Sequence, residues 1–202
     1  MRFKPLLLLG LAVCALLVVL NDRSSAQSAG TGDDDATRIR IGFKVAPVPL
    51  NLHLKDPNLV GLGSYIVNTQ GWCNDCHTLN PWAAGHDPTS GQEPQQMNAA
   101  QYLAGGSQFG TPLGGVVTSP NLTPDEHGLP DGLSLARFLK TFQTGLDPDN
   151  GHPEISPYLQ AMPWPYHRLQ TRHDLEAIYE YLRAIPSLQT PTADATTRRE
   201  TE

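Results

Sequence analysis

The most constraining feature of this 202-residue chain is the short run Cys73-Asn74-Asp75-Cys76-His77. Cysteines three positions apart lie on neighbouring faces of one helical turn, so two thiols can reach two vinyl groups of a single haem. The histidine that follows at once can bind the iron. C-x-x-C-H is the pattern at which a c-type haem is attached. The sequence therefore predicts one covalent haem c, held by Cys73 and Cys76, with His77 as the proximal iron ligand.

Two other chemistries use a C-x-x-C pair, and the rest of the chain argues against both. A structural zinc site needs four ligands. The third cysteine, Cys14, lies in an apolar leader, and only His167 and His173, six positions apart, come near the spacing of a zinc-binding histidine pair. A thioredoxin-like redox pair would need a βαβ pattern beside it, and none flanks this run. A haem-free metal or disulfide module is left only if the cysteines do not take haem.

Residues 1–26 have the composition of a signal peptide. Arg2 and Lys4 precede an apolar run at 6–20, and Ser24-Ser25-Ala26 offers a small-residue cleavage site. The apolar run is shorter than the stretch of about 20 residues that spans a membrane. The sequence therefore predicts export to the periplasm, with a tether to the inner membrane by an uncleaved leader as the alternative.

The mature chain is acidic. Cleavage after Ala26 removes three basic residues and one acidic residue, so the formal charge falls from −6 to −8. A negative surface argues against nucleic acid and anionic membranes as partners. It is compatible with a partner that carries a basic patch, and equally with simple solubility.

We expect residues 27–57 to form a flexible linker and an extended arm. Residues 27–36 are small, polar and acidic. Alternating apolar residues then predict a half-buried extended segment, and two prolines prevent a regular central strand. These residues are Ile39, Ile41, Phe43, Val45, Pro47 and Pro49.

Three helices are predicted in the following domain, at residues 58–188. The first begins after the N-cap Asp56 and runs to about Asn68, with Gly61 and Gly63 at a crossing with another helix. The second covers 134–144 and stops at Gly145. The third covers 171–185, begins with a capping box and stops at a proline. Irregular, glycine- and proline-rich chain separates the first two helices, and the tail at 189–202 is predicted to be disordered.

A second site of interest is Met162, in the run Met162-Pro163-Trp164-Pro165. Prolines on both sides of Trp164 stiffen the backbone, which would hold the Met162 sulfur in a fixed direction without a helix. A methionine thioether opposite a histidine is the usual ligand pair of cytochromes c.

Together these motifs resemble class I c-type cytochromes. More narrowly, they are similar to the haem modules of cytochrome subunits that serve bacterial membrane-bound alcohol, aldehyde and gluconate dehydrogenases. The resemblance runs from about residue 59 to 186. It implies an all-α, class I cytochrome c-like domain around one covalent haem, in which the first and last helices cross and Met162 is the distal ligand. The motifs that carry it are at residues 103–106, 119–125, 138–145, 161–163 and 174–183.

The chain departs from those subunits in two places. It has one haem motif, where they usually carry three, and Leu133 stands near the place of a tryptophan that usually precedes the middle helix. The first difference bears on partnership with such a dehydrogenase, and neither alters the haem motif.

Other residues compete for roles at the haem. Met97 and His167 are alternatives to Met162 as distal ligand, whereas the remaining histidines suit a solvated surface. Trp72 and Trp164 are expected either to pack on the macrocycle or to belong to an ordinary core. Two further residues, Asn121 and Thr123, suit either a haem propionate or a turn before Pro124.

The leading functional hypothesis is an exported monohaem cytochrome that passes single electrons between redox partners, such as a dehydrogenase or a terminal oxidase. It is then an electron carrier and no enzyme by itself, because one domain of ordinary size leaves no room for a separate catalytic domain. The alternative is a haem enzyme or a gas or redox sensor, which would need a labile distal ligand at Met162.

Overall fold

The computed structural model describes residues 34–112, 114–146 and 157–191 of the chain. The pattern of contacts divides the chain into two units, residues 1–38 and residues 39–202. The predicted leader, the acidic turn at 147–151 and most of the predicted tail lie outside the described residues. Within the described ranges, no helix is long and apolar enough to cross a membrane.

The prediction of an extended arm is wrong for residues 34–45, which are helical. Ile39 and Phe43 alternate with polar neighbours, but they are also four positions apart and so share one face of a helix. That face lies against Gly61, where an added Cβ would meet both side chains at 2.7 Å. A Cβ at Gly42 would collide with the Gly61 carbonyl oxygen, so the two helices approach closely at these glycines. Residues 39–57 therefore belong to the same unit as the predicted domain 58–188.

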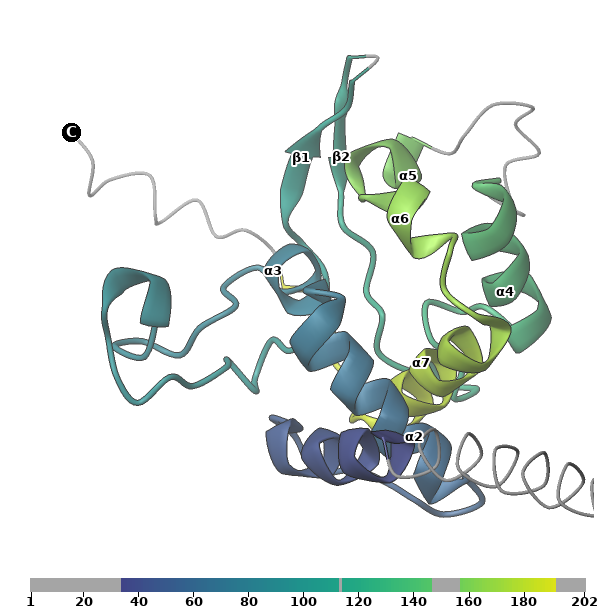
Figure 1. Ribbon diagram of the computed structural model, residues 1–202. Helices are drawn as coiled ribbons and strands as arrows, with labels where there is room; N and C mark the ends of the chain where they lie inside the picture. Colours follow the sequence, from purple (N-terminus) through teal and green to yellow (C-terminus); the bar gives the residue numbers. More distant parts are fainter. Residues whose placement is uncertain (1–33, 113, 147–156, 192–202) are drawn as a thin grey trace, which may run out of the picture. The chain divides into compact units, whose positions relative to one another are not determined.

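The second unit is mainly helical, as predicted, and its described residues hold one two-stranded sheet (Figure 1). Short helical turns lie close to the candidate haem motif in the sequence, and longer helices precede and follow them. The elements are α2 (Pro57–Tyr65), η1 (Ile66–Gln70), α3 (Cys73–His77), η2 (Pro88–Ser90), β1 (Gln108–Gly110), β2 (Val116–Thr118), α4 (Leu135–Thr144), α5 (Pro157–Ala161), α6 (Trp164–His167) and α7 (Arg172–Ala184).

Helices α2 and α7 pack on each other and form the core of the unit. The predicted caps are confirmed, because the Asp56 side chain accepts from the Asn58 amide at 2.8 Å and the Thr171 side chain caps α7. A Cβ at Gly63 would collide with the Ala177 carbonyl group, so the two helices approach closely at this glycine. The buried side chains around this contact are Val60, Leu62, Ile66, Val67, Leu175, Ile178, Tyr181 and Leu182.

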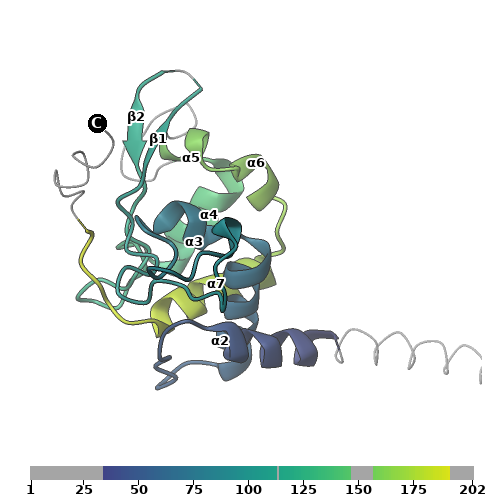
Figure 2. The same cartoon turned by 90° about the vertical axis from the view of Figure 1, so that its left-hand side faces the viewer.

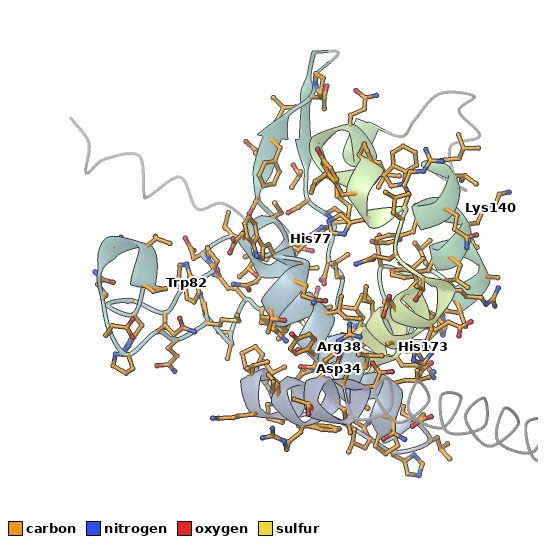
Figure 3. The ribbon with its side chains drawn as sticks, viewed as in Figure 1. Asp34, Arg38, His77, Trp82, Lys140 and His173 are labelled. Carbon is orange, nitrogen blue, oxygen red and sulfur yellow. The ribbon has the colours of Figure 1, made fainter. Side chains whose placement is uncertain are left out.

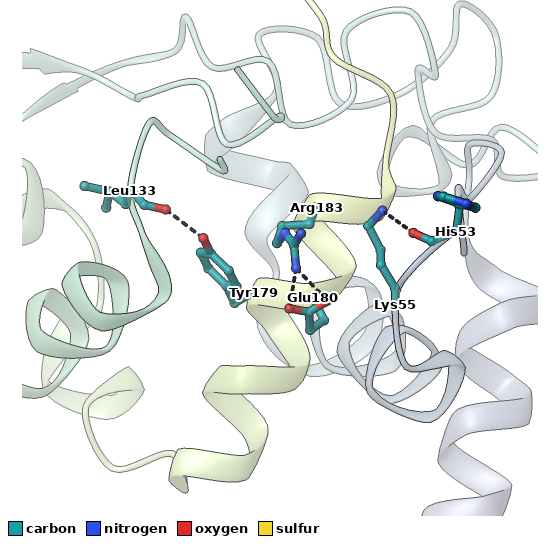
Figure 4. A network of polar contacts seen from close by, with 6 residues as sticks. All are labelled: His53, Lys55, Leu133, Tyr179, Glu180 and Arg183. Atoms are coloured by element: carbon teal, nitrogen blue, oxygen red, sulfur yellow. Dashed lines mark hydrogen bonds and ion pairs between the residues drawn. The ribbon is translucent and has the colours of Figure 1, made fainter. Parts of the chain in front are cut away.

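Helix α4 also begins and ends as predicted, with Ser134 as N-cap and Gly145 after its last turn. Its Phe138 packs against Tyr179 of α7, with ring centroids 5.4 Å apart. The Tyr179 hydroxyl donates to the Leu133 carbonyl at 2.9 Å, which ties the entry of α4 to α7 (Figure 4). On the next turn of α7, Arg183 pairs with Glu180 at 2.8 Å (Figure 4).

Between α3 and α4 the chain is irregular, as predicted. Residues 79–101 leave the helices as an excursion, which is closed by a bridge between Trp82 and Met97 (Figure 1). A short hairpin follows, in which Gln108 pairs with Thr118, and it lies beside α5 in both views (Figures 1 and 2). Strand β2 then leads directly to the chain beside α3.

Candidate haem site

The C-x-x-C-H run forms helix α3, a single turn that is entered through an unusual backbone. The π-helical turn η1 closes with a bond of 2.7 Å from the Gly71 amide to the Ile66 carbonyl. Trp72 then adopts a left-handed conformation, with φ of 51°, which is uncommon for a residue other than glycine. A Cβ at Gly71 would meet the Cys73 Sγ at 3.0 Å, so a small residue leaves this thiol its place.

Both cysteines of α3 are free thiols and partly buried. Burial raises the pKa of Cys73 to about 12, and burial followed by the nearby Asp75 carboxylate raises the pKa of Cys76. Both groups are therefore protonated at neutral pH. Metal coordination requires the thiolate form, so this environment suits neutral sulfur better than a thiolate metal site.

The His77 ring is oriented by a backbone carbonyl. Its Nδ1 lies 3.0 Å from the Pro120 oxygen, and because a carbonyl can only accept, Nδ1 carries the hydrogen. The lone pair of the neutral ring is then on Nε2. Burial lowers the pKa of His77, so the ring stays neutral in spite of the favourable bond to Pro120. A bond of this kind on the far nitrogen is typical of metal-ligating histidines.

Gly105 allows the chain at Pro120 to lie beside His77. Gly105 has φ of 76°, its amide donates to the His77 carbonyl at 2.7 Å, and it lies against the segment at Ser119 and Pro120. A Cβ at this position would meet the Pro120 carbonyl carbon at 2.7 Å. Gly105 therefore packs against the backbone that orients His77, and Thr118 and Pro120 of the same stretch line the cavity described next.

Cys73, Cys76, His77 and Met162 all line one cavity of about 700 Å³. This volume lies in the range of small-molecule and cofactor sites. Much of the wall is apolar and comes from η1, the chain before and within α4, and α7. The apolar lining includes Ile66, Val67, Leu122, Leu133, Phe138, Phe142, Ile178 and Leu182.

Met162 reaches the cavity from the junction of α5 and α6. The prediction of a helix-free support is wrong, because Trp164 starts the short helix α6 directly after Pro163. Proline suits the first turn of a helix, where its missing N–H is not needed. The Trp164 Nε1 donates to the Phe142 carbonyl at 2.7 Å, and the side chain is only 5% exposed. Met162 thus stands next to a firmly anchored residue.

Some of the other residues considered for roles at the haem line the cavity, and others do not. Met97 does not line this cavity and lies in the excursion, as does Trp82 in Figure 3. Trp72 lines the cavity but is 73% exposed. Trp164 packs on Gly145 as part of the core. Among the described histidines only His77 and His167 line the cavity; His152 lies outside the described residues.

Asn121 and Thr123 form a turn that fastens the C-terminal segment, and neither lines the cavity. The Asn121 Oδ1 accepts from the Thr123 amide at 2.9 Å, and its Nδ2 donates to the Leu188 carbonyl at 2.8 Å. The Leu188 amide in turn donates to the Thr123 hydroxyl at 3.0 Å. Of the two predicted roles, the turn is the one that the structure shows.

Two residues that sequence reasoning missed have polar atoms without a partner. The Thr141 Oγ1 and the Gln170 Oε1 are buried, have no hydrogen-bond partner in the described structure, and belong to side chains that line the cavity. Buried polar groups are normally hydrogen-bonded. The Thr141 hydroxyl can donate to a carboxylate, such as a propionate of a haem, whereas the Gln170 Oε1 can only accept and needs a donor. The residues present therefore fit a largely apolar ring system with polar groups at its edge.

A closed polar ring lies behind Cys73 and was also not predicted. The Tyr102 hydroxyl donates to the Asn68 Oδ1 at 2.6 Å, and the Asn68 Nδ2 donates to the Tyr181 oxygen at 3.2 Å. The two hydroxyls are 2.9 Å apart, so Tyr181 donates to Tyr102. Burial raises the pKa of both phenols, and the charge of a Cys73 thiolate would raise them further. The ring joins η1, the 98–103 loop and α7 beside the cavity.

Comparison with protein-family models and with curated proteins finds no match for this chain. No group of three or more histidine, cysteine, aspartate or glutamate side chains that could hold a metal ion occurs within the described ranges. What the site offers is two cysteines, one oriented histidine and one methionine around a single cavity.

Proposed function

We propose that this chain is an exported, single-haem c-type cytochrome that passes electrons one at a time between redox proteins. The observation that carries the proposal is the convergence of Cys73, Cys76, His77 and Met162 on one largely apolar cavity. Helix α3 supplies the first three and the α5–α6 junction supplies the fourth. The mainly helical unit, with α2 packed on α7, supports the finer proposal of a class I cytochrome c fold.

Each residue has a distinct role in this proposal. Cys73 and Cys76 would hold the haem through two thioether bonds, and their neutral, buried sulfurs are in keeping with that bond. His77 would bind the iron through Nε2, because Nδ1 is engaged by Pro120. Met162 would bind on the other side. When bound, the haem would supply an iron that alternates between the ferrous and ferric states.

The protein's own contribution is to keep the iron environment constant through that change. Apolar side chains of η1, α4 and α7 exclude water from the cavity, which favours the less charged state of the iron. With His77 and Met162 both holding the iron, no position on it would be left for a substrate. A histidine–methionine pair also raises the reduction potential, which suits transfer toward a terminal acceptor.

The proposed partners are redox proteins, such as a dehydrogenase that donates electrons or a terminal oxidase that accepts them. Docking between such proteins is usually small in area and brief. The acidic chain would favour a partner with a basic surface. We propose a periplasmic location on the basis of the leader at residues 1–26, with an inner-membrane tether if that leader is retained.

The test is spectroscopy on protein produced with the haem-attachment machinery. We expect a haem that stays on the protein after denaturation, a low-spin spectrum in both redox states and no reaction with carbon monoxide. The charge-transfer absorption of an iron–thioether bond should be present and should disappear in Met162→Ala. The single variants Cys73→Ser and Cys76→Ser should each keep the haem through one bond, and the double variant should lose it on denaturation.

Absence of covalent haem would overturn the proposal. High-spin haem or ready carbon monoxide binding in the natural protein would instead favour a haem enzyme or a gas sensor, because both need an open position on the iron.

A further inference from the structure

The cavity contains a second side chain that is able to bind iron beside Met162. His167 is the last residue of α6 and lines the same cavity as His77 and Met162. Its ring is partly buried and meets the edge of Phe142, with centroids 6.4 Å apart and planes at 85°. No hydrogen bond joins either ring nitrogen to another described residue. A partly buried imidazole that has no polar partner among the described residues is suited to gain one from what the cavity binds.

The two histidines are close enough to influence each other. Burial is the main cause of the lowered pKa of His77, and a positive charge on His167 would lower it further. Burial also lowers the pKa of His167. The influence of one ring on the other indicates that His167 faces the same part of the cavity as His77.

Met162 precedes α6 and His167 ends it, and the anchored Trp164 lies between them in the sequence. Trp164 is tied to the Phe142 carbonyl, and its ring packs against the backbone of Gly145, where a Cβ would meet it at 2.8 Å. The guanidinium of Arg168 lies 5.0 Å from the same ring. Met162 and His167 both line the cavity, and the anchored Trp164 between them holds α6 in place.

We propose that His167 is a reserve distal ligand, which binds the haem iron when the Met162 thioether does not. This inference rests on the proposed function, since it concerns the same haem. A histidine pair gives a lower reduction potential than a histidine–methionine pair. The iron would then have one reduction potential with Met162 bound and a lower one with His167 bound, and it would be closed to small gases in both states. Loss of the thioether would change the direction of electron flow without creating an open haem.

The experiment compares four proteins that carry covalent haem: the natural chain, Met162→Ala, Met162→Ala/His167→Ala and Met162→Ala/His173→Ala. His173 is the matched control, because it is an exposed histidine near the start of α7, away from His77 in Figure 3. The measurements are the spin state by electron paramagnetic resonance, the reduction potential and the affinity for carbon monoxide. Met162→Leu replaces Met162→Ala throughout if the alanine variants load too little haem.

We expect Met162→Ala and its His173→Ala control to remain low-spin, with a potential below that of the natural protein. Met162→Ala/His167→Ala should become high-spin and bind carbon monoxide. If His167 occupies the iron for about nine-tenths of the time, carbon monoxide should bind Met162→Ala about tenfold more weakly than the double variant. Added imidazole should restore the low-spin spectrum of the double variant, which shows that its cavity is intact.

A high-spin Met162→Ala that binds carbon monoxide as tightly as the double variant would overturn the inference, because His167 then lies on a propionate or in solvent. A natural protein without covalent low-spin haem would overturn the proposed function instead. An unchanged potential in Met162→Ala would remove Met162 as the resting ligand and with it the reserve role of His167.

Discussion

Substitution of Gly105 by alanine should disturb both the stability of the protein and the electronic state of His77. Gly105 has φ of 76°, and a Cβ there would meet the Pro120 carbonyl carbon at 2.7 Å. The left-handed conformation costs an alanine roughly 1–2 kcal/mol. Overpacking against a fixed neighbour costs about 1–3 kcal/mol more. A less flexible unfolded chain returns about 0.4–1 kcal/mol.

Gly128→Ala is the matched control. Gly128 has φ of 74°, close to that of Gly105, but a Cβ there would have nothing within 4 Å. It should therefore show the conformational cost alone, whereas Gly105→Ala should lose about 1–3 kcal/mol more. In a domain of this size each kcal/mol lowers the melting temperature by about 2–4 °C. Urea or thermal unfolding of the haem-loaded variants gives the comparison.

The reduction potential gives a second measurement, which reports on the bond to His77 and not on the stability of the fold. The bond from His77 Nδ1 to the Pro120 oxygen makes the imidazole a stronger donor, which favours ferric iron. Pushing the Pro120 carbonyl away should weaken that bond and raise the potential in Gly105→Ala but not in Gly128→Ala. Equal stabilities and equal potentials for the two variants would refute the reasoning, because Gly105 would then not set the position of Pro120.

Three further predictions concern residues that line the cavity or support it from behind. Burial raises the pKa of Tyr102 and Tyr181, so the stability they provide is fully present below the ordinary tyrosine pKa of about 10 and is lost as the pH rises above it. The urea midpoint should therefore fall less between neutral and alkaline pH when both tyrosines are replaced by phenylalanine. An equal fall in the two proteins would contradict this. Thr141→Val should destabilise the haem-loaded protein by about 0.5–1.5 kcal/mol if the haem accepts a hydrogen bond from the Thr141 hydroxyl. Equal or greater stability of the variant in chemical denaturation would mean that this hydroxyl stays unpaired. Trp164→Phe removes the bond to the Phe142 carbonyl and should cost about 1–3 kcal/mol. Added to Met162→Ala/His167→Ala, whose iron is open to carbon monoxide, it should speed carbon monoxide binding in flow experiments; an unchanged rate would show that α6 does not depend on this anchor.

The helices that could be predicted are those with local start and stop signals. Asp56 with its following proline, Ser134 with Gly145, and Thr171 with its capping box all act within a few residues, so the sequence displays them. The helix at 34–45 was missed because Ile39 and Phe43 fit a period of two as well as a helical face. Only the contact with Gly61 distinguishes the two, and it joins distant parts of the chain.

The candidate site shows the same difference between local sequence signals and contacts made by distant parts of the chain. Cys73, Cys76 and His77 are contiguous, and Met162 lies in a recognisable run, so all four could be proposed from the sequence. Their meeting at one cavity is a property of the fold. The unpaired oxygens of Thr141 and Gln170 could not be predicted, because being buried without a partner depends on everything that packs around them.

The partner of His77 is a backbone oxygen, and every amino acid has one. No single side-chain replacement at position 120 deletes this acceptor, so the tautomer of the imidazole is insulated from point mutation there. Variation would have to act through the path of the chain, by a change at Gly105 or by an insertion or deletion in the hairpin at 108–118. We therefore expect homologous chains to tolerate varied residues at this position while holding the hairpin to a constant length.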